Sequence, residues 1–180
     1  MPYGRLVVGF ETENMEQGLS DKQVLLKAAA YCAQSEHCTL EVVHKLNQWG
    51  VASDSHEAIL AFLEKEGYLD NQRYADAFVR DKFRYNKWGK VKIARALREK
   101  EVEREFIEHA LSVLDDEDYR SVLLELLKGK QRTLKSKSTY EEKQKLIRFA
   151  LGRGFEMKEI LKCLSLSEDM EYGFDDENDS

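Results

Sequence analysis

The 180-residue sequence contains one proline, at position 2, so no proline interrupts any helix in the rest of the chain. Long apolar runs are also missing near the N-terminus, where the stretch from Leu6 to Phe10 is five residues long before Glu11 follows. That stretch is too short for a secretory signal peptide or a membrane span. We therefore expect a cytoplasmic protein without membrane association.

Cysteine and histidine are too few and too irregularly spaced to form a recognisable catalytic or metal site. The three cysteines form no CxxC pair, and a low, odd number of cysteines suits a reducing compartment. No P-loop, GxSxG, HExxH or GxGxxG motif occurs. Cys32, His37, Cys38 and His44 lack the spacing of ordinary zinc-ligand pairs. The sequence predicts a protein that is not an enzyme, with no catalytic residues, metal ion or cofactor.

What the chain does contain is one apolar pattern repeated three times. Each copy has an apolar residue, a second one five positions later, and then an Ile-x-x-x-Leu pair on a further segment. The copies are Leu46–Val51–Ile59–Leu63, Leu97–Val102–Ile107–Leu111 and Ala150–Phe155–Ile160–Leu164, offset by 51 and 53 positions. A fixed offset of this size indicates a supersecondary unit whose copies stack. Three such units would span on the order of 60 Å, which favours a long binding surface over a substrate pocket.

Helical periodicity and glycine stops predict an all-α fold, an elongated array of three tandem three-helix repeats. The predicted repeats cover residues 20–69, 70–114 and 115–165, with an irregular extension over 1–19 and an acidic disordered tail over 166–180. In the second and third repeats we expect helices over residues 71–84, 89–100, 103–114, 116–128, 139–152 and 156–164, with a basic loop over 130–138.

Candidate helix caps are visible in the sequence as Ser or Thr before an apolar-periodic segment. Ser20 is followed by Gln23 and Thr139 by Glu142, which is the spacing of a capping box. Thr39 and Ser53 are the expected caps of the second and third helices of the first repeat.

The formal net charge of −6 conceals strong segregation of charge along the chain. Residues 73–100 hold ten Lys/Arg against three Asp/Glu, and residues 128–148 hold eight against two, whereas residues 165–180 hold seven acidic residues and no basic one. Clustered charge of one sign costs stability through repulsion, so the basic clusters favour an anionic partner. Trp88 lies among these cations in an expected turn and is a candidate to stack on bases or guanidinium planes, whereas Phe83 is expected in the core.

Three segments together resemble one known family. The second repeat reads GYLDNQRYADAFVR from Gly67 and GKVKIARALREK from Gly89, and the third contains RFALGRGF from Arg148, followed by Ile160. These stretches resemble the RecX family of bacterial recombination regulators over about residues 22–165. The first repeat departs from the family pattern, since CTLEV from Cys38 carries no basic residue.

The resemblance implies a non-enzymatic modulator of the RecA recombinase. Such a protein would lie in the groove of the RecA–single-stranded-DNA filament and inhibit ATP hydrolysis and strand exchange in homologous recombination, DNA repair and the SOS response, and some members bind DNA directly. The absence of a long heptad seam favours a monomer. The cations expected to contact the filament, or single- or double-stranded DNA, are Arg73, Arg80, Arg84, Lys87, Lys90, Lys92, Arg95, Arg98, Lys145, Arg148 and Arg153.

An alternative is a stand-alone DNA-binding protein that acts through its basic repeat without RecA. The Gly89 turn and the helix containing Lys92 and Arg98 have the local pattern of a helix-turn-helix.

Overall fold

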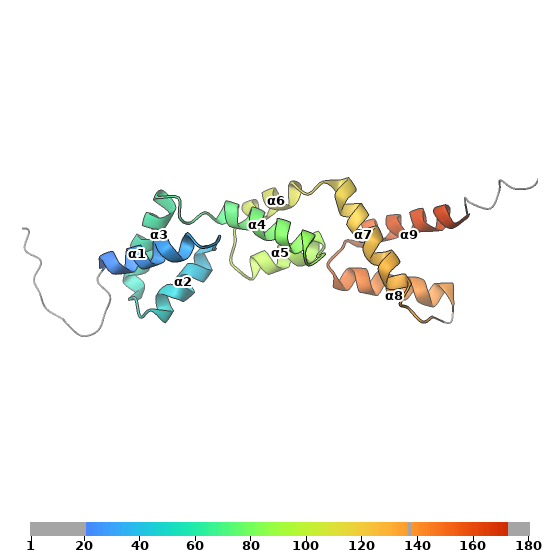
Figure 1. Ribbon diagram of the computed structural model, residues 1–180, viewed down its shortest axis with the longest axis horizontal. Coiled ribbons are helices and arrows are strands. Elements are labelled where there is room, and N and C mark those ends of the chain that lie inside the picture. The colour runs from blue at the N-terminus through green and yellow to red at the C-terminus, as the bar shows by residue number, and fades with distance from the viewer. Residues whose placement is uncertain (1–20, 137, 173–180) are drawn as a thin grey trace, which may run out of the picture.

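The computed structural model describes residues 21–136 and 138–172, and arranges them as an elongated row of helices (Figure 1). These residues form nine α-helices in chain order and no strand. The first repeat holds α1 (Asp21–Cys32), α2 (Thr39–Gln48), a 3-10 turn η1 (Ser53–Ser55) and α3 (His56–Lys65); the second holds α4 (Asn71–Arg84), α5 (Lys90–Arg98) and α6 (Arg104–Ser112); the third holds α7 (Asp116–Gln131), α8 (Thr139–Gly152) and α9 (Met157–Tyr172). The predicted all-α array of three three-helix repeats is confirmed.

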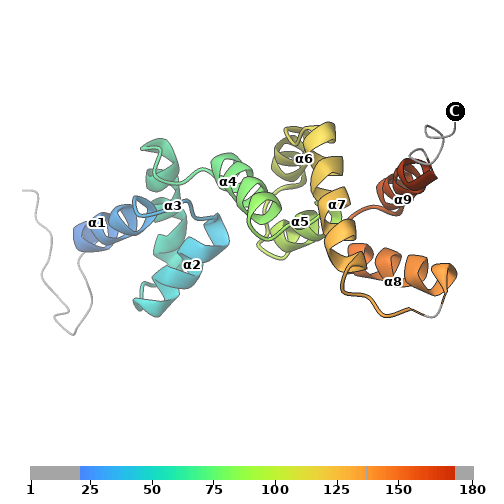
Figure 2. The same ribbon diagram turned by 45° about the vertical axis from the view of Figure 1, so that its right-hand side comes forward.

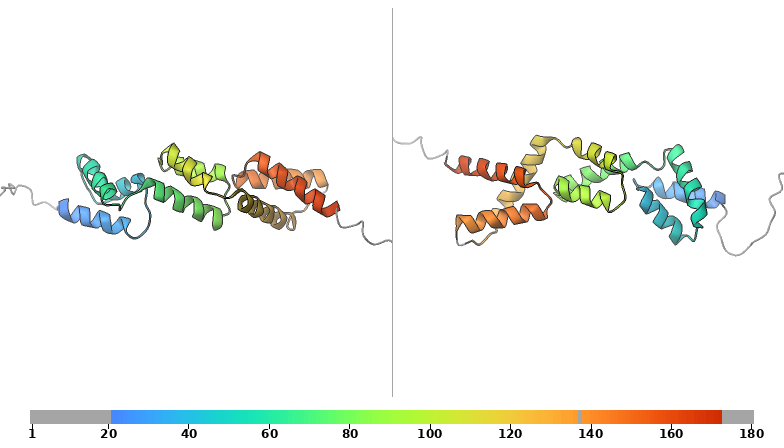
Figure 3. Two further views of the ribbon diagram at one scale, coloured as in Figure 1. Left: turned by 90° about the horizontal axis from the view of Figure 1, so that it is seen from above. Right: turned by 180° about the vertical axis from the view of Figure 1, so that it is seen from behind.

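The views in Figures 2 and 3 agree that the repeats follow one another in chain order, with α1 near one end of the row and α9 near the other. Within the part of the chain that the structure describes, no helix is long and apolar enough to cross a bilayer.

The residues of the repeated pattern form the cores. All twelve are buried except Val51 and Leu111, which are half-buried. One core cluster belongs to the first repeat, while a second runs without a break through the second and third repeats. Because a lone unit of this size has a marginal core, the shared cluster stabilises the two later repeats as one block. Cys38 of the first repeat, 1% exposed, also belongs to that larger cluster.

Each repeat has a left-handed residue two or three positions after the last residue of its second helix. Gly50 (φ 73°), Glu101 (φ 58°) and Gly154 (φ 87°) are separated by the same offsets of 51 and 53 as the apolar pattern. Left-handed backbone after a helix redirects the chain into the next helix at little cost when the residue is glycine. The three repeats therefore share the backbone conformation of this turn as well as the pattern of buried residues.

The caps of the first repeat differ from the prediction. Cys38 takes the N-cap position of α2 without a side-chain cap, and Thr39 is the first helical residue. The Thr39 hydroxyl instead donates to Oδ1 of Asn71 at 3.3 Å, in the second repeat. Ser53 opens the 3-10 turn rather than capping α3. Ser20 lies outside the described residues.

In the later repeats, α4, α7 and α8 are capped by Asp or Ser side chains, as expected for N-caps, but the capping residue of α8 is not the predicted one. Asp70 and Asp115 cap α4 and α7 by accepting backbone N–H groups of the first turn. For α8 the cap is Ser138, one residue before the predicted Thr139, and its hydroxyl accepts from the Glu141 N–H at 3.2 Å.

Two helices are longer than the sequence predicts. Helix α7 continues to Gln131, which shortens the expected basic loop, and Lys128 and Lys130 in its last turn suit the negative end of the helix dipole. Helix α9 continues eight residues past its predicted end at Leu164, to Tyr172. The expected N-terminal extension over 1–19 and the last eight residues, 173–180, lie outside the described residues.

Candidate functional site

Backbone hydrogen bonds join the second and third repeats. The Gly89 N–H donates to the Arg153 carbonyl at 2.9 Å and the Val91 N–H donates to the Gly154 carbonyl at 3.1 Å. A Cβ at Gly89 would overlap the Gly154 carbonyl, and a Cβ at Gly154 would overlap Lys92. The start of α5 is thus fixed against the α8–α9 turn at a separation that only glycine allows.

Tyr119 holds the same joint from α7. Its ring is 2% exposed, and its hydroxyl accepts the Lys90 N–H at 2.9 Å while donating to Glu156 at 2.5 Å. Burial first, and the Glu156 carboxylate next, raise the pKa of the Tyr119 phenol, so it stays protonated as a donor. This hydrogen bond occupies an N–H at the α5 N-terminus that has no partner within the helix.

The joint between the first and second repeats uses side chains instead. Glu41 of α2 accepts from Lys100 at 2.5 Å and from the Tyr74 hydroxyl at 3.1 Å, and its other oxygen meets His37 at 3.1 Å. Although burial alone would raise the pKa of Glu41, the donors at Lys100 and His37 hold it below its usual range. Tyr74 and Tyr119 are both the fourth residue of their helices, so corresponding tyrosines serve both joints.

A cationic and aromatic surface lies beside the second joint. We call it the α5 surface, and it consists of Lys82, Trp88, Val91, Lys92, Arg95, Arg98 and Leu151. Trp88 is half-buried between two ammonium groups, with Lys92 4.5 Å and Lys82 5.5 Å from its ring centroid. Val91 is 55% exposed and lines a groove with Arg95 and Leu151. Cations around an indole, beside a groove lined by both apolar and charged side chains, suit a partner that is both anionic and apolar or aromatic.

Four of the cations expected to bind a partner are engaged within the fold. Arg73 pairs with Glu36 of the first repeat at 2.6 Å and donates to the Gly67 carbonyl at 3.1 Å. Lys90 lies 4.8 Å from the Tyr119 ring centroid and 3.4 Å from Asp116. Arg153 donates to the Asn86 carbonyl at 3.0 Å, and Lys145 donates to the Lys135 carbonyl at 2.8 Å and pairs with Glu141. These contacts give each of the four side chains a structural role.

Of the seven remaining expected cations, the five arginines are exposed, and Lys87 and Lys92 are half-buried. Within the described residues, Arg95 makes an exposed i,i+4 pair with Glu99 at 2.9 Å and no other ion pair, and Arg148 donates to a carbonyl of its own helix. Exposed pairs of this kind are worth little and are easily exchanged for a partner. Among the described residues no ion pair within 4 Å involves the other five, which are Arg80, Arg84, Lys87, Lys92 and Arg98.

Arg80 and Arg84 lie apart from the α5 surface. They line a hollow between α4 and α6 together with acidic side chains of the α7 N-terminus, Asp115 and Asp118. This mixed charge makes the hollow less suited to a polyanion than the α5 surface, which has Glu99 as the one acid along its groove.

Of the four first-repeat residues weighed as a zinc set, Cys32, Cys38 and His37 are engaged within the fold, and His44 is exposed. Cys32 and Cys38 are buried, and burial raises the pKa of both thiols. His37 stacks on Tyr31 at 3.9 Å, and its two ring nitrogens face Ser35 and Glu41. Within the described residues no group of three His, Cys, Asp or Glu side chains could hold a metal ion.

Comparison with known families gives the context for this arrangement. Residues 70–111 match the second three-helix domain of RecX, and residues 116–164 match its third three-helix domain. This chain belongs to the RecX family. The matched ranges begin at the N-cap Asp70 and immediately after the N-cap Asp115, so they correspond to the second and third repeats.

Individual RecX proteins are similar over most of the chain. The regulatory protein RecX of Pelodictyon phaeoclathratiforme is 30% identical over 132 residues, covering 72% of this chain and 79% of that protein. Those of Clostridium botulinum (strain Eklund 17B) and Clostridium perfringens (strain 13) are 32% and 31% identical, and the chain spans only 66% and 63% of their lengths. The crystal structure of RecX from Lactobacillus salivarius superposes with a TM-score of 0.74 over 80% of this chain and 94% of that one, at 19% identity, which shows the shared fold.

Reasoning from the sequence missed the contacts that join the repeats. Glu41, Asn71 and Tyr119 connect repeats through partners more than 25 positions away, and helical periodicity does not reveal such partners. The available signal was the common offset of Gly50, Glu101 and Gly154, which marks equivalent turns.

Proposed function

We propose that this RecX-family chain binds the RecA–single-stranded-DNA filament and inhibits its ATPase and strand-exchange activities. The observation that carries the proposal is the α5 surface, where two half-buried lysines flank a half-buried indole beside the joint of two repeats that share one core. A surface held by backbone hydrogen bonds loses little conformational freedom on binding.

The elongated shape supports a polymeric target. The three repeats form a row rather than a compact globule (Figure 1), so one chain can contact neighbouring subunits of a filament. A ligand that bridges subunits in one arrangement shifts the filament toward that arrangement by its differential affinity. Inhibition then follows when the favoured arrangement hydrolyses ATP slowly or exchanges strands slowly. No covalent chemistry is needed.

Direct DNA binding is the second candidate, and one observation favours it. Trp88 and its flanking lysines have the composition of a single-strand stacking platform. The two candidates differ in what limits affinity. Phosphate-dominated binding to duplex DNA falls with salt with a slope of roughly 0.9 per contact, whereas a filament binder needs RecA for tight association.

The test is a pair of equilibrium titrations of the labelled chain, one with a fluorescent single-stranded oligonucleotide and one with the same oligonucleotide coated by RecA and a non-hydrolysable ATP analogue. We expect affinity for the coated strand to exceed that for the bare strand by at least about tenfold at physiological ionic strength. Equal affinities would reject the filament proposal and favour stand-alone DNA binding.

A further inference from the structure

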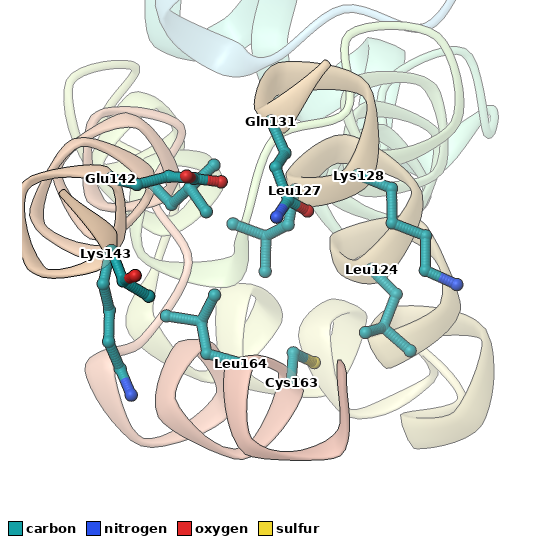
Figure 4. A pocket seen from close by; sticks show the side chains of 10 residues that line it. Leu124, Leu127, Lys128, Gln131, Glu142, Lys143, Cys163 and Leu164 are labelled. Atoms are coloured by element: carbon teal, nitrogen blue, oxygen red, sulfur yellow. The ribbon is translucent and has the colours of Figure 1, made fainter. Parts of the chain in front are cut away.

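The groove of the α5 surface is larger than the hollow inside the third repeat and, unlike it, has exposed apolar walls. The hollow, which Figure 4 shows between α7 and α9, has a volume of about 80 Å³, and Leu127 and Leu164 in its wall are buried. The groove has a volume of about 520 Å³, and two side chains that line it, Val91 and Leu151, are 55% and 41% exposed. Exposed apolar side chains from two repeats that line one groove, rather than lying scattered, indicate a site for an apolar group of a partner.

Arginines lie on either side of this apolar strip. On α5, Arg95 comes one turn after Val91, and its side chain is 78% exposed. On α8, the exposed Arg148 comes three residues before Leu151, which places both on the same side of that helix. Figures 1 and 2 show α5 and α8 extending from their joint in opposite directions, so the two arginines are separated by the strip. This arrangement fits a segment that carries an aliphatic side chain between acidic residues, because guanidinium groups pair well with carboxylates.

The groove suits a protein segment better than a nucleic-acid strand. Trp88, the one aromatic residue among the described residues that line it, is half-buried, and the ammonium groups of Lys92 and Lys82 lie 4.5 Å and 5.5 Å from its ring centroid. A base would have to displace a lysine to stack on this indole. Glu99 also lines the groove. Its carboxylate can accept an N–H of a peptide backbone, whereas the deoxyribose–phosphate backbone of DNA offers no donor and brings further negative charge.

We propose that this groove binds a segment of a protein partner in which an aliphatic side chain lies between acidic residues. The aliphatic side chain contacts Val91 and Leu151, and the flanking carboxylates pair with Arg95 and Arg148. Resting on the proposed function, this segment belongs to the protein coat of the filament and not to its DNA strand. Because the groove crosses the joint of two repeats, the backbone hydrogen bonds at that joint hold its two walls in place.

The first test uses the full chain without RecA. Methyl-NMR follows Val91 and Leu151 during titration with three probes: the peptide acetyl-EDLDE-amide, the matched peptide acetyl-EDSDE-amide of equal charge, and a five-nucleotide thymidine strand. We expect the leucine peptide to shift both residues and to bind about fivefold more tightly than the serine peptide, because only leucine buries an aliphatic side chain. The methyls of Leu26 and Val113, which are exposed elsewhere on the surface, should stay in place.

Each other result of this titration counts against the proposal. Equal shifts with the two peptides would show that charge alone drives binding, and no shift with the leucine peptide would show that the groove does not take such a segment. Tighter binding of the thymidine strand would assign the groove to nucleic acid.

The second test measures two double variants of the full chain with the RecA-coated strand and with the bare strand. Val91→Ser combined with Leu151→Ser should weaken binding to the coated strand by at least about tenfold and leave binding to the bare strand unchanged. Leu26→Ser combined with Val113→Ser removes one exposed leucine and one exposed valine away from the groove, and should change neither affinity. Circular dichroism checks that both variants keep their helix content.

The outcomes separate this proposal from the proposed function. Equal weakening on the coated and the bare strand would show that the groove contacts DNA, and no weakening on either would reject the groove as a binding site. If the parent chain itself does not bind the coated strand, the proposed function fails, while the peptide titration still decides what the groove binds. That titration uses the parent chain, so it also decides the matter if the serine variant loses helix.

Discussion

Gly89 and Gly154 approach each other so closely that the α5 N-terminus and the α8–α9 turn are joined through their main chains, with the Val91 N–H donating to the Gly154 carbonyl at 3.1 Å. Neither position has room for a side chain. The consequence is that the second and third repeats form one block, whereas the first repeat is attached by side-chain contacts around Glu41 and Arg73.

Gly154→Ala is expected to destabilise this block more than an equivalent change elsewhere. Gly50 has a similar backbone conformation, φ 73° against 87°, but nothing lies within 4 Å of the Cβ it would gain. Gly50→Ala should therefore cost only the left-handed strain of about 1–2 kcal/mol. Gly154→Ala should cost a further 1–3 kcal/mol or so, from overlap with Lys92. Urea denaturation of the two variants measures the difference.

Amide hydrogen exchange shows which backbone hydrogen bonds are weakened in each variant. The Gly89 and Val91 amides should lose protection in Gly154→Ala and keep it in Gly50→Ala. Equal destabilisation by the two variants would mean that the close approach of Gly154 to α5 does not contribute to the stability of the fold.

Glu41→Gln tests the first joint and its pH dependence. The donors at Lys100 and His37 lower the pKa of Glu41 in the folded chain, so its contribution to stability is present above the unfolded carboxyl pKa and is lost as pH falls through the depressed folded value. At neutral pH the variant should be less stable by about 1–2 kcal/mol. The measurement is the difference in unfolding free energy between the parent and Glu41→Gln from pH 7 to pH 3.

That difference should shrink toward zero with acidification, because the parent carboxylate becomes protonated and then resembles the amide. A difference independent of pH would show that the carboxylate charge does not hold the joint. Asp54→Asn, at an exposed acidic residue of the 3-10 turn, provides the control and should show no such trend.

Arg95→Glu combined with Arg98→Glu should weaken binding to the RecA-coated strand by at least about tenfold, because two cations of the α5 surface become anions. Both side chains are exposed, so helix content should remain unchanged. Arg104→Glu is the matched control, since Arg104 makes the same kind of exposed i,i+4 pair, with Glu108, on α6 of the same repeat.

Circular dichroism and the filament titration are measured on all three proteins. Loss of helix in the double variant would show that these arginines are structural. Because Arg104→Glu changes the net charge half as much as the double variant, a loss of binding free energy about half as large would show that total charge, rather than the α5 surface, governs binding.

The helices and cores were predictable because each depends on neighbours within about four positions. Ile93 and Leu97, or Ile160 and Leu164, share a helix face, and that spacing is visible in the sequence. The asparagine and glutamate that fasten the repeats were not predictable in this way. Asn71 bonds Thr39 at a separation of 32 positions, and Glu41 bonds Lys100 at 59.

The candidate site was predictable in part. Wheel geometry places Arg95 and Arg98 on the outside of their helix, where the structure has them. The same geometry groups Arg73 with Arg80, yet Arg73 pairs with Glu36 of the neighbouring repeat. Which exposed cation is taken up by another repeat depends on how the repeats stack, and the periodicity of a single helix carries no information about stacking.

The central claim, that this chain restrains a RecA filament through an elongated helical array, is tested most directly by the DNA-dependent ATPase rate of RecA in the presence of increasing amounts of the purified chain. The account predicts that the rate falls at less than one chain per RecA subunit, and that Arg104→Glu inhibits as well as the parent while the Arg95 and Arg98 double variant does not. An ATPase rate and a strand-exchange yield that stay unchanged at equimolar chain would contradict it.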